Sequence, residues 1–244
     1  MKALDTRALS KYFGGLSAIH GISLEIEQGE RRAIIGPNGA GKTTLFNLIS
    51  GFLYPSSGRI FLFGQDVTNL PTHKRMVLGL SRTFQVTNLF PNLSLFDTIL
   101  LGVQALNRAW FCFYRPIRSF REMMVQTESL LKEWNVWENR EVLIKNLSYG
   151  EQRQVEVILA LASKPHFLLL DEPTAGLSPA ETALMISIIK RLPPDITIVL
   201  IEHDMDVAFE IADKITVLHF GSILAEGPLE QIRGNPKVTE IYLG

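Results

Sequence analysis

A glycine-rich segment, GPNGAGKTT at residues 36–44, contains the residue types that hold phosphate groups. It fits the pattern G-x-x-x-x-G-K-[S/T], in which glycines allow backbone N–H groups to turn inward around phosphate oxygens. The pattern places Lys42 to reach the β- and γ-phosphates of a nucleotide, and the Thr43 hydroxyl to bind Mg²⁺. The predicted phosphate-binding residues are Gly36, Pro37, Asn38, Gly39, Ala40, Gly41, Lys42, Thr43 and Thr44.

The flanking sequence favours this interpretation over an ordinary glycine-rich turn. The run RRAIIG (31–36) predicts a buried strand before the segment, and LFNLIS (45–50) predicts a helix that ends at Gly51. The amino end of such a helix adds its positive dipole to a phosphate site. No guanine-reading motif of the NKxD type follows, so ATP is favoured over GTP.

Two carboxylates end another apolar run, FLLLDEP at residues 167–173. Charge at the end of a buried strand is costly unless it meets a cation or hydrogen-bond donors. We therefore expect Asp171 to hold the Mg²⁺ shared with Thr43, directly or through water. Glu172 is expected to orient or deprotonate the attacking water. The alternative is a solvated strand end with Glu172 capping a turn, and the phosphate segment upstream argues against it.

Strand and helix patterns alternate around these groups. Short strands joined by turns are predicted for the first sixty residues, and helices dominate from about Asn92 to Ser163. The alternation predicts a largely parallel sheet with helices on its faces and the helical middle as an inserted lobe. Further strands are predicted at 57–67, 166–173 and 196–203, a hairpin at 214–227 that turns at Phe220–Gly221, and helices at about 179–191 and 204–212.

Composition excludes several other classes of protein. The chain has 244 residues with 24 Lys and Arg against 25 Asp and Glu, and a net charge of −1 gives no indication of nucleic-acid binding. Its one cysteine permits no internal disulfide and disfavours a metal cluster. We recognise no signal peptide, and no stretch reaches the ~18–20 apolar residues that span a bilayer, so we expect the chain to be soluble by itself.

The joint occurrence of four motifs resembles the ATP-binding subunits of ABC transporters. The phosphate segment, LSYGEQ (147–152), DEP (171–173) and IEH (201–203) occur in the order and at the distances usual in that family, and the resemblance covers essentially the whole chain. It implies an α/β fold: a P-loop NTPase core with a mostly parallel central sheet, a small N-terminal antiparallel β subdomain and an inserted α-helical subdomain. It also implies a single domain, 1–244, with a RecA-like core at about 1–91 and 164–244 and a helical subdomain at about 92–163.

The resemblance assigns roles to three isolated residues. Phe13 matches an aromatic residue that stacks on adenine, with Tyr12 as the next candidate and a core aromatic as the alternative for both. Gln85, in SRTFQ, matches the glutamine that reaches Mg²⁺ and the attacking water. His203 matches the histidine that contacts the γ-phosphate. The implied cofactors are ATP and Mg²⁺.

The segment LSYGEQ is a reasonable start for a helix, and it also matches the family signature usually written LSGGQ. In the family this segment closes over ATP held by the other subunit of a head-to-tail dimer. The resemblance therefore implies γ-phosphate contacts from the Ser148 hydroxyl and from N–H groups near Gly150. Glu151, which replaces Gln, should face away from phosphate oxygens, and a ribose hydroxyl is an acceptable partner. Tyr149 replaces Gly, and Ser178 replaces an Asp that often ends the segment TAGLSP.

Finer features resemble one subfamily, the ATPases of bacterial branched-chain amino-acid importers, and within it the LivG type with a long helical insertion. The insertion, at 108–140, is interpreted either as a surface groove that contacts a membrane subunit or as a helical hairpin with solvated arginines. Its aromatic and basic residues are Trp110, Phe111, Phe113, Tyr114, Arg108, Arg115, Arg118 and Arg121. The segments that carry the subfamily resemblance are FGGLSAIHGIS, GLSRTFQ, LFPNLSLFDTILLG, LSYGEQRQVE, AGLSPAE and NPKVTEIYLG.

This resemblance implies an ATP-hydrolysing importer subunit, peripheral on the cytoplasmic face of the inner (plasma) membrane. The implied partners are a second ABC ATPase subunit, identical or paralogous, two integral membrane permease subunits and, indirectly, a periplasmic or surface substrate-binding protein. Nucleic acid is not an expected partner. The cargo would be branched-chain or other hydrophobic amino acids. An importer ATPase for an amide, urea or aromatic acid, an exporter ATPase, a non-transport ABC ATPase and a nucleotide sensor remain as alternatives.

Overall fold

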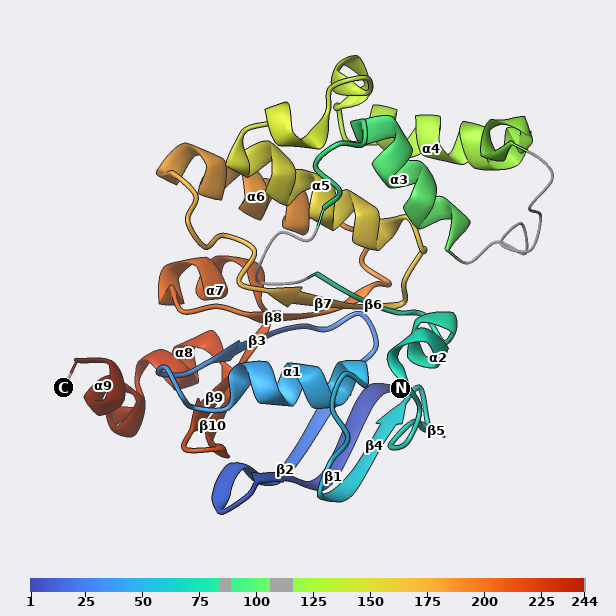
Figure 1. Cartoon of the computed structure of the whole chain (residues 1–244). Coiled ribbons are helices and arrows are strands. Elements are labelled where there is room, and N and C mark those ends of the chain that lie inside the picture. Colours follow the sequence, from blue (N-terminus) through green and yellow to red (C-terminus); the bar gives the residue numbers. More distant parts are fainter. Residues whose placement is uncertain (84–88, 106–115, 244) are drawn as a thin grey trace. The chain divides into compact units, whose positions relative to one another are not determined.

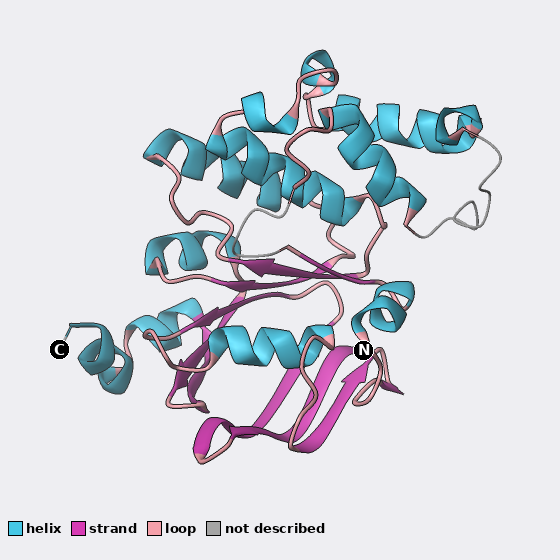
Figure 2. Cartoon of the chain, in the orientation of Figure 1, coloured by secondary structure: helices cyan, strands magenta, loops and turns pink. Residues whose placement is uncertain are grey.

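The computed structural model describes residues 1–83, 89–105 and 116–243 (Figure 1). The chain forms two compact units, one made of residues 1–82 and 166–244 and the other of residues 83–165. Figure 2 shows that the strands gather in the first unit, whereas the second is helical. Among the described residues, none of the helices combines the length and apolar character needed to cross a membrane.

The first unit is built on a six-stranded sheet whose order is β10-β9-β3-β8-β7-β6. Neighbouring strands are parallel except for the antiparallel hairpin of β9 and β10. β7 and β8 are buried along their whole length, as strands covered on both faces must be. The predicted parallel sheet and the hairpin turn at Phe220–Gly221 are thus confirmed. The strands are β3 (Arg31–Ile35), β6 (Leu80–Arg82), β7 (Phe167–Asp171), β8 (Thr197–Ile201), β9 (Lys214–His219) and β10 (Ser222–Pro228).

A second, antiparallel sheet has the order β2-β1-β4-β5 and confirms the predicted N-terminal β subdomain. Its strands are β1 (Lys2–Phe13), β2 (Leu16–Glu27), β4 (Ser57–Leu62) and β5 (Gln65–Asp66). The prediction of short strands here was wrong for β1 and β2, which have 12 residues each. β1 continues through register shifts, including one at Ala8, whose φ is 46°, and such bulges let a strand bend without ending.

Helix α1 (Lys42–Ser50) lies between the two sheets in Figure 1. Leu45, Phe46 and Ile49 belong to one buried core together with side chains of both sheets, which fixes α1 against them. On the other face of the central sheet, α7 (Met205–Ile211) packs against β3 and α6 (Pro179–Lys190) packs against α7. Both predicted helices are therefore confirmed to within one residue at each end. The unit also contains α2 (Thr72–Val77), α8 (Leu229–Arg233) and α9 (Pro236–Leu243).

The carboxyl end of α1 is held by Arg75 of α2, which is fully buried. Its guanidinium donates to the carbonyl oxygens of Leu48 at 2.7 Å and Ile49 at 2.6 Å, and also to those of Leu70 and Thr68. Burial lowers the pKa of Arg75 to about 10, so the group remains a cation at neutral pH. A cation at this end complements the helix dipole and thereby stabilises α1.

In the second unit, α3 (Leu95–Gln104) packs against α4 (Arg121–Glu133) and α5 (Tyr149–Leu161). The prediction that helices dominate this part of the chain is confirmed for its described residues. A side chain in place of Gly102 would put its Cβ 2.6 Å from the Leu159 side chain, so glycine is what permits the close approach of α3 to α5. Short 3₁₀ turns connect the helices: η2 (Ile117–Ser119), η3 (Trp137–Asn139) and η4 (Ile144–Asn146).

Candidate functional site

The predicted phosphate loop and the predicted carboxylates lie at the same edge of the central sheet, where the parallel strands end. Ile34 of β3 pairs with Ile201 of β8, and Ile201 pairs with Asp171 of β7, so these three residues share one level across adjacent parallel strands. The phosphate loop begins two residues after Ile34, and Glu202 and Glu172 directly follow the other two residues. The carboxyl edge of an open α/β sheet is where such folds bind ligands.

The phosphate loop is wrapped around the Lys42 side chain. Lys42 Nζ donates to the carbonyl oxygens of Gly36 at 2.5 Å and Pro37 at 3.1 Å. Gly41 forms the N-cap of α1 with φ at 101°, and no side chain accepts a hydrogen bond from the first turn there. A Cβ on Gly41 would lie 2.7 Å from the Ala18 carbonyl oxygen, so only glycine fits. The amide groups at the start of α1 are thus suited to an anion.

Lys42 is 7% exposed, and its ammonium interacts electrostatically with both carboxylates at the end of β7. Burial lowers the pKa of Lys42, while the charges of Glu172 and Asp171 act in the opposite direction. Thr43, by contrast, is exposed on the first turn of α1, and Asn38 and Gly39 are exposed at the tip of the loop. A buried ammonium surrounded by reachable donors is an arrangement that suits a polyphosphate.

Asp171 is 2% exposed and accepts a hydrogen bond on Oδ2 from Arg82 Nη2 at 2.8 Å. The same guanidinium donates to Asn47 Oδ1 at 2.7 Å and to Ser50 Oγ at 3.0 Å, both on α1. Arg82 therefore connects the helix of the phosphate loop to the acidic strand end. Sequence reasoning gave Arg82 no role, because 89 residues separate it from Asp171 and no spacing pattern pairs them.

The donor set at this edge fits a magnesium ion. The Thr43 hydroxyl and the Asp171 carboxylate are oxygen ligands of the kind that Mg²⁺ prefers, and neither is a soft sulfur or nitrogen donor. Gln85, the third predicted ligand, lies outside the described residues.

Glu172 has a left-handed backbone, with φ at 48°, and its N–H donates to the Ile201 carbonyl oxygen at 3.0 Å. A non-glycine residue in this region is strained, and such strain gathers at functional sites. His203, one strand away, has a side chain that is 59% exposed. Glu202, which directly precedes His203, is fully buried, and sequence reasoning did not assign it a role. The signal was present, since Glu202 is a carboxylate at the end of an apolar strand, as Asp171 is.

The aromatic candidates Phe13 and Tyr12 lie at the end of β1, and each is 46% exposed. The alternative of a core aromatic is therefore wrong for both. Lys11 Nζ lies 5.3 Å from the centroid of the Phe13 ring. The exposed ring is available for stacking on a planar ligand.

In the second unit, Ser148 is the N-cap of α5 and forms a capping box with Glu151. Ser148 Oγ accepts from the Glu151 N–H at 3.2 Å, and Glu151 Oε2 accepts from the Ser148 N–H at 2.7 Å. The predicted helix start is confirmed, and Glu151 gains a structural explanation as the second half of the cap. Tyr149 also has a partner, because its hydroxyl accepts from Arg153 Nε at 3.1 Å.

Ser178 is likewise an N-cap, of α6, in a capping box with Glu181. Ser178 Oγ accepts from the Glu181 N–H at 3.4 Å, and Glu181 Oε2 accepts from the Ser178 N–H at 2.9 Å. The spacing Ser-x-x-Glu could have revealed this cap from the sequence. The insertion aromatics Trp110, Phe111, Phe113 and Tyr114, with Arg108 and Arg115, lie outside the described residues, whereas Arg118 pairs with Asp97 at 3.0 Å.

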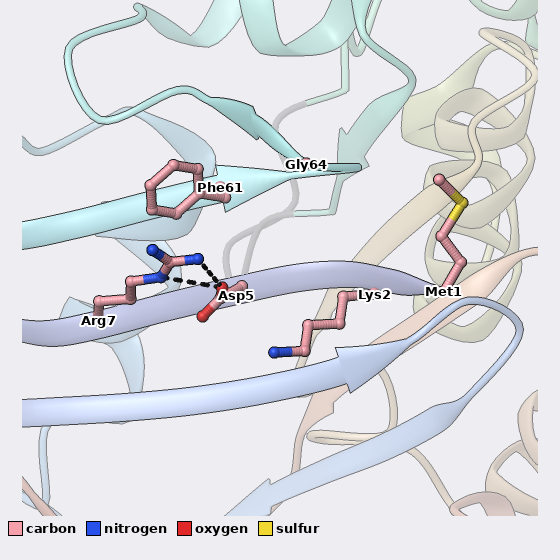
Figure 3. Close-up of a pocket in the computed structure, with 6 residues that line it drawn as sticks. All are labelled: Met1, Lys2, Asp5, Arg7, Phe61 and Gly64. Atoms are coloured by element: carbon pink, nitrogen blue, oxygen red, sulfur yellow. Dashed lines mark hydrogen bonds and ion pairs between the residues drawn. The ribbon is translucent and has the colours of Figure 1, made fainter.

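A separate pocket of about 290 Å³ lies over β1 and β4 (Figure 3). Arg7 donates to Asp5 Oδ2 from Nε and Nη2, at 3.1 and 2.8 Å, and its guanidinium lies 4.4 Å from the centroid of the Phe61 ring. These contacts join neighbouring side chains of the antiparallel sheet and account for their placement. The other lining residues are Met1, Lys2 and Gly64, so none of the predicted site residues lines this pocket.

The family model described as ABC transporter matches residues 19–175. The chain is 40% identical over 248 residues to the high-affinity branched-chain amino acid transport ATP-binding protein BraF of Pseudomonas aeruginosa, covering 99% of this chain and 97% of BraF. It is 38% identical, with the same coverage, to the protein LivG of Escherichia coli K12, which bears the same description.

Solved structures agree with these matches. The ATP-binding cassette MJ1267 in its ADP conformation is 32% identical, with a TM-score of 0.90, and covers 100% of this chain and 99% of its own. A dimeric, post-hydrolysis structure of the cassette MJ0796 bound to ADP and Pi is 25% identical, with a TM-score of 0.78, covering 93% of this chain and 98% of its own.

Proposed function

Because the chain belongs to the family of ABC transporter ATPases, we propose that it powers an importer of branched-chain or other hydrophobic amino acids. The observation that carries the cargo class is the likeness to BraF and LivG over 97% of their length. An ATPase subunit does not touch the cargo, so the cargo class depends on that likeness. The site geometry supports the reaction class, since Lys42, Asp171, Glu172 and His203 follow adjacent strands at one sheet edge.

Each residue of the site has one task in the proposed reaction. Lys42 and the amides of residues 36–44 would bind the β- and γ-phosphates, and Phe13 would stack on adenine. Thr43, Gln85 and Asp171 would hold Mg²⁺, which when bound neutralises charge on the phosphate oxygens. Glu172 would accept a proton from the attacking water, and His203 would donate to the γ-phosphate. The reaction releases ADP and phosphate.

The nucleotide site is proposed to be shared between two subunits. Ser148, Gly150 and Glu151 of one subunit would close over ATP on the phosphate loop of the other. Ser148 Oγ already accepts from the Glu151 N–H, so the Ser148 hydroxyl proton and the other amides of the first turn of α5 would be the donors to the γ-phosphate. MJ0796, which has been solved as a dimer with ADP and Pi, is an example of a related cassette that pairs.

The proposed assembly places this subunit at the cytoplasmic face of the inner membrane. Two copies, or one copy and a paralogue, would dock on two integral membrane permease subunits, and a periplasmic or surface binding protein would deliver the cargo. In the proposed domain organisation the RecA-like core and the β subdomain form the first unit, and the helical subdomain forms the second.

The central test is Glu172→Gln, which keeps the side-chain size but removes the base. It should bind ATP normally and hydrolyse it about 10²–10⁴-fold more slowly, since that is the usual contribution of a general base. Hydrolysis is measured as phosphate release with and without EDTA, and pairing by size-exclusion chromatography with ATP. If the variant turns over ATP as fast as the wild type, Glu172 is not the base. If hydrolysis continues in EDTA, the reaction does not need Mg²⁺.

The cargo class requires the whole transporter. With its permeases in proteoliposomes, the wild-type subunit should hydrolyse ATP faster when a leucine-loaded binding protein is present. Stimulation by urea or an amide, and not by leucine, would keep the ATPase assignment and replace the cargo.

A further inference from the structure

The Glu202 carboxylate is buried with only one of its two oxygens in use. Its exposure is 0%. Oε1 accepts two hydrogen bonds from Thr174, one from Oγ1 at 2.8 Å and one from the backbone N–H at 3.3 Å. Oε2 has no hydrogen-bond partner among the described residues. An unsatisfied buried acceptor of this kind is costly, and where a fold retains one it requires an explanation.

A candidate partner for Oε2 is the adjacent residue, His203. Its Nδ1 lies 4.0 Å from Oε2, which is beyond hydrogen-bond distance. Because the His203 side chain is 59% exposed, it has room to rotate about its side-chain bonds.

The electrostatics of Glu202 point the same way. Burial raises the pKa of the Glu202 carboxyl, with Glu172 adding to the effect, while Thr174 and the charge of His203 oppose it. A protonated imidazole hydrogen-bonded to Oε2 would therefore relieve the burial of this carboxylate.

We propose that Glu202 is a positioning residue for His203: Oε2 accepts a hydrogen bond from His203 Nδ1–H when nucleotide occupies the site, which turns Nε2 toward the γ-phosphate. An anionic phosphate accepts a hydrogen bond from Nε2–H, and a carboxylate acceptor at Nδ1–H holds the ring in the orientation that presents it. The inference rests on the proposed function, because it refines how His203 serves the same ATP site.

Through Thr174 the same carboxylate also reaches the segment after Glu172. Thr174 lies two residues beyond Glu172, and both of its donors hold Oε1. Glu202 would thus set the relative position of the base and of the γ-phosphate ligand from a single buried group. The contact between Oε2 and His203 is required only by the positioning role, whereas the contact between Oε1 and Thr174 would also be present in a purely structural role.

Two variants distinguish the contact of Glu202 with His203 from its contact with Thr174. Glu202→Gln keeps an acceptor for Thr174 but replaces Oε2 with an NH₂ group, which cannot accept from Nδ1–H. Thr174→Val removes one donor to Oε1 and leaves Oε2 intact. Glu202→Gln should lower kcat by about 10–100-fold, as loss of an orienting partner usually does, with the KM for ATP unchanged within about twofold. Thr174→Val should lower kcat by no more than about threefold.

The spectroscopic readout does not depend on turnover. In ¹⁵N-histidine-labelled Glu172→Gln protein, adding Mg²⁺ and ATP should shift the His203 Nδ1 resonance to that of a protonated, hydrogen-bonded nitrogen. The resonance is assigned with a His203→Gln variant, and the shift should be absent when Glu202→Gln is added. Circular dichroism and thermal melting confirm that each variant is folded. Should Glu202→Gln fail to fold, the ATP-dependent shift in the Glu172→Gln protein alone decides.

Wild-type turnover of Glu202→Gln, equal losses in both variants, or an Nδ1 resonance that does not respond to ATP would each overturn the inference. Failure of the proposed function looks different, because the wild-type protein would then neither bind nor hydrolyse ATP. If the wild type hydrolyses ATP and any of these three outcomes is seen, the positioning role of Glu202 is wrong and the proposed function still stands.

Discussion

At the scale of single residues, Lys42 is a buried cation whose side chain is hydrogen-bonded to its own loop. Its ammonium is 7% exposed and donates to carbonyl oxygens of Gly36 and Pro37. Because burial lowers its pKa, the group is stabilised by added negative charge, which phosphates supply. An arriving nucleotide therefore meets a cation whose surroundings already favour an anionic partner.

Lys42→Ala should weaken ATP binding by about 10–100-fold, the loss expected for a buried charge-assisted contact of about 1.5–3 kcal/mol. Binding is measured by titration with a fluorescent ATP analogue. Lys190→Ala is the matched control, because it removes an exposed lysine that pairs with Glu210 on the surface. Equal affinities for the wild type and Lys42→Ala would refute the phosphate role.

Arg82 is a second residue-scale feature, since its ion pair with Asp171 is buried at both ends. Arg82→Met should lower the free energy of unfolding by about 3–5 kcal/mol, because removing one partner of a buried ion pair is strongly destabilising. Urea denaturation followed by circular dichroism measures the change. Arg7→Met, which breaks a pair whose arginine is 64% exposed, should lower the free energy of unfolding far less, because solvent screens an exposed pair. Similar losses for the two variants would contradict this ranking.

At the scale of elements, one helix of each unit begins with the same kind of cap. α5 and α6 both begin with a serine whose partner is a glutamate three residues later. Ser178 is therefore explained as a helix cap, although the family often has Asp there. Serine and aspartate are nearly equal as N-caps, so the departure leaves the start of α6 intact.

The capping role of Ser178 can be tested with two substitutions. Ser178→Asp should leave the melting temperature unchanged, whereas Ser178→Ala should lower the unfolding free energy by about 1 kcal/mol through loss of the cap. Thermal and urea unfolding measure both. If Ser178→Ala were as stable as the wild type, the capping box would have no energetic role. A change in ATP turnover in Ser178→Asp with unchanged stability would show that the side chain acts beyond the cap.

Elements also show why some structure could be predicted from the sequence and some could not. The runs that form β3, β7 and β8 are continuously or almost continuously buried, so their type was predictable, and their ends were predictable to within two residues. β6 has three residues, Leu80–Arg82, which is too short for any periodicity. β1 was predicted as a shorter strand because its bulge interrupts the alternation of buried and exposed residues.

At the scale of the whole molecule, the sequence motifs predicted the family, and the comparisons confirm it. They predicted residues that are expected to touch ligand in their own right, such as Lys42 and Glu172. They did not identify residues that act through another side chain, such as Arg82, Arg75 and Glu202. Those roles depend on contacts between segments 26 to 89 residues apart, which only the folded chain brings together.

The proposed dimer separates the two halves of the nucleotide site between molecules, with the phosphate loop in one unit of the chain and Ser148 in the other. Ser148→Arg should therefore leave ATP binding to the single chain within about twofold of the wild type, since its own phosphate loop is unchanged. ATP-driven pairing and hydrolysis should both be lost, because a bulky cation replaces the cap that faces the partner's nucleotide. Pairing is measured in the Glu172→Gln background by size-exclusion chromatography with ATP.

Loss of the cap itself costs about 1 kcal/mol, so the stability of Ser148→Arg is measured alongside. Ser119→Arg adds the same charge at an exposed residue of the same unit and should pair and hydrolyse like the wild type. If Ser148→Arg lost ATP binding as a single chain, Ser148 would serve its own subunit, and the shared site would be wrong. If it paired normally with ATP, the signature segment would lie outside the dimer contact.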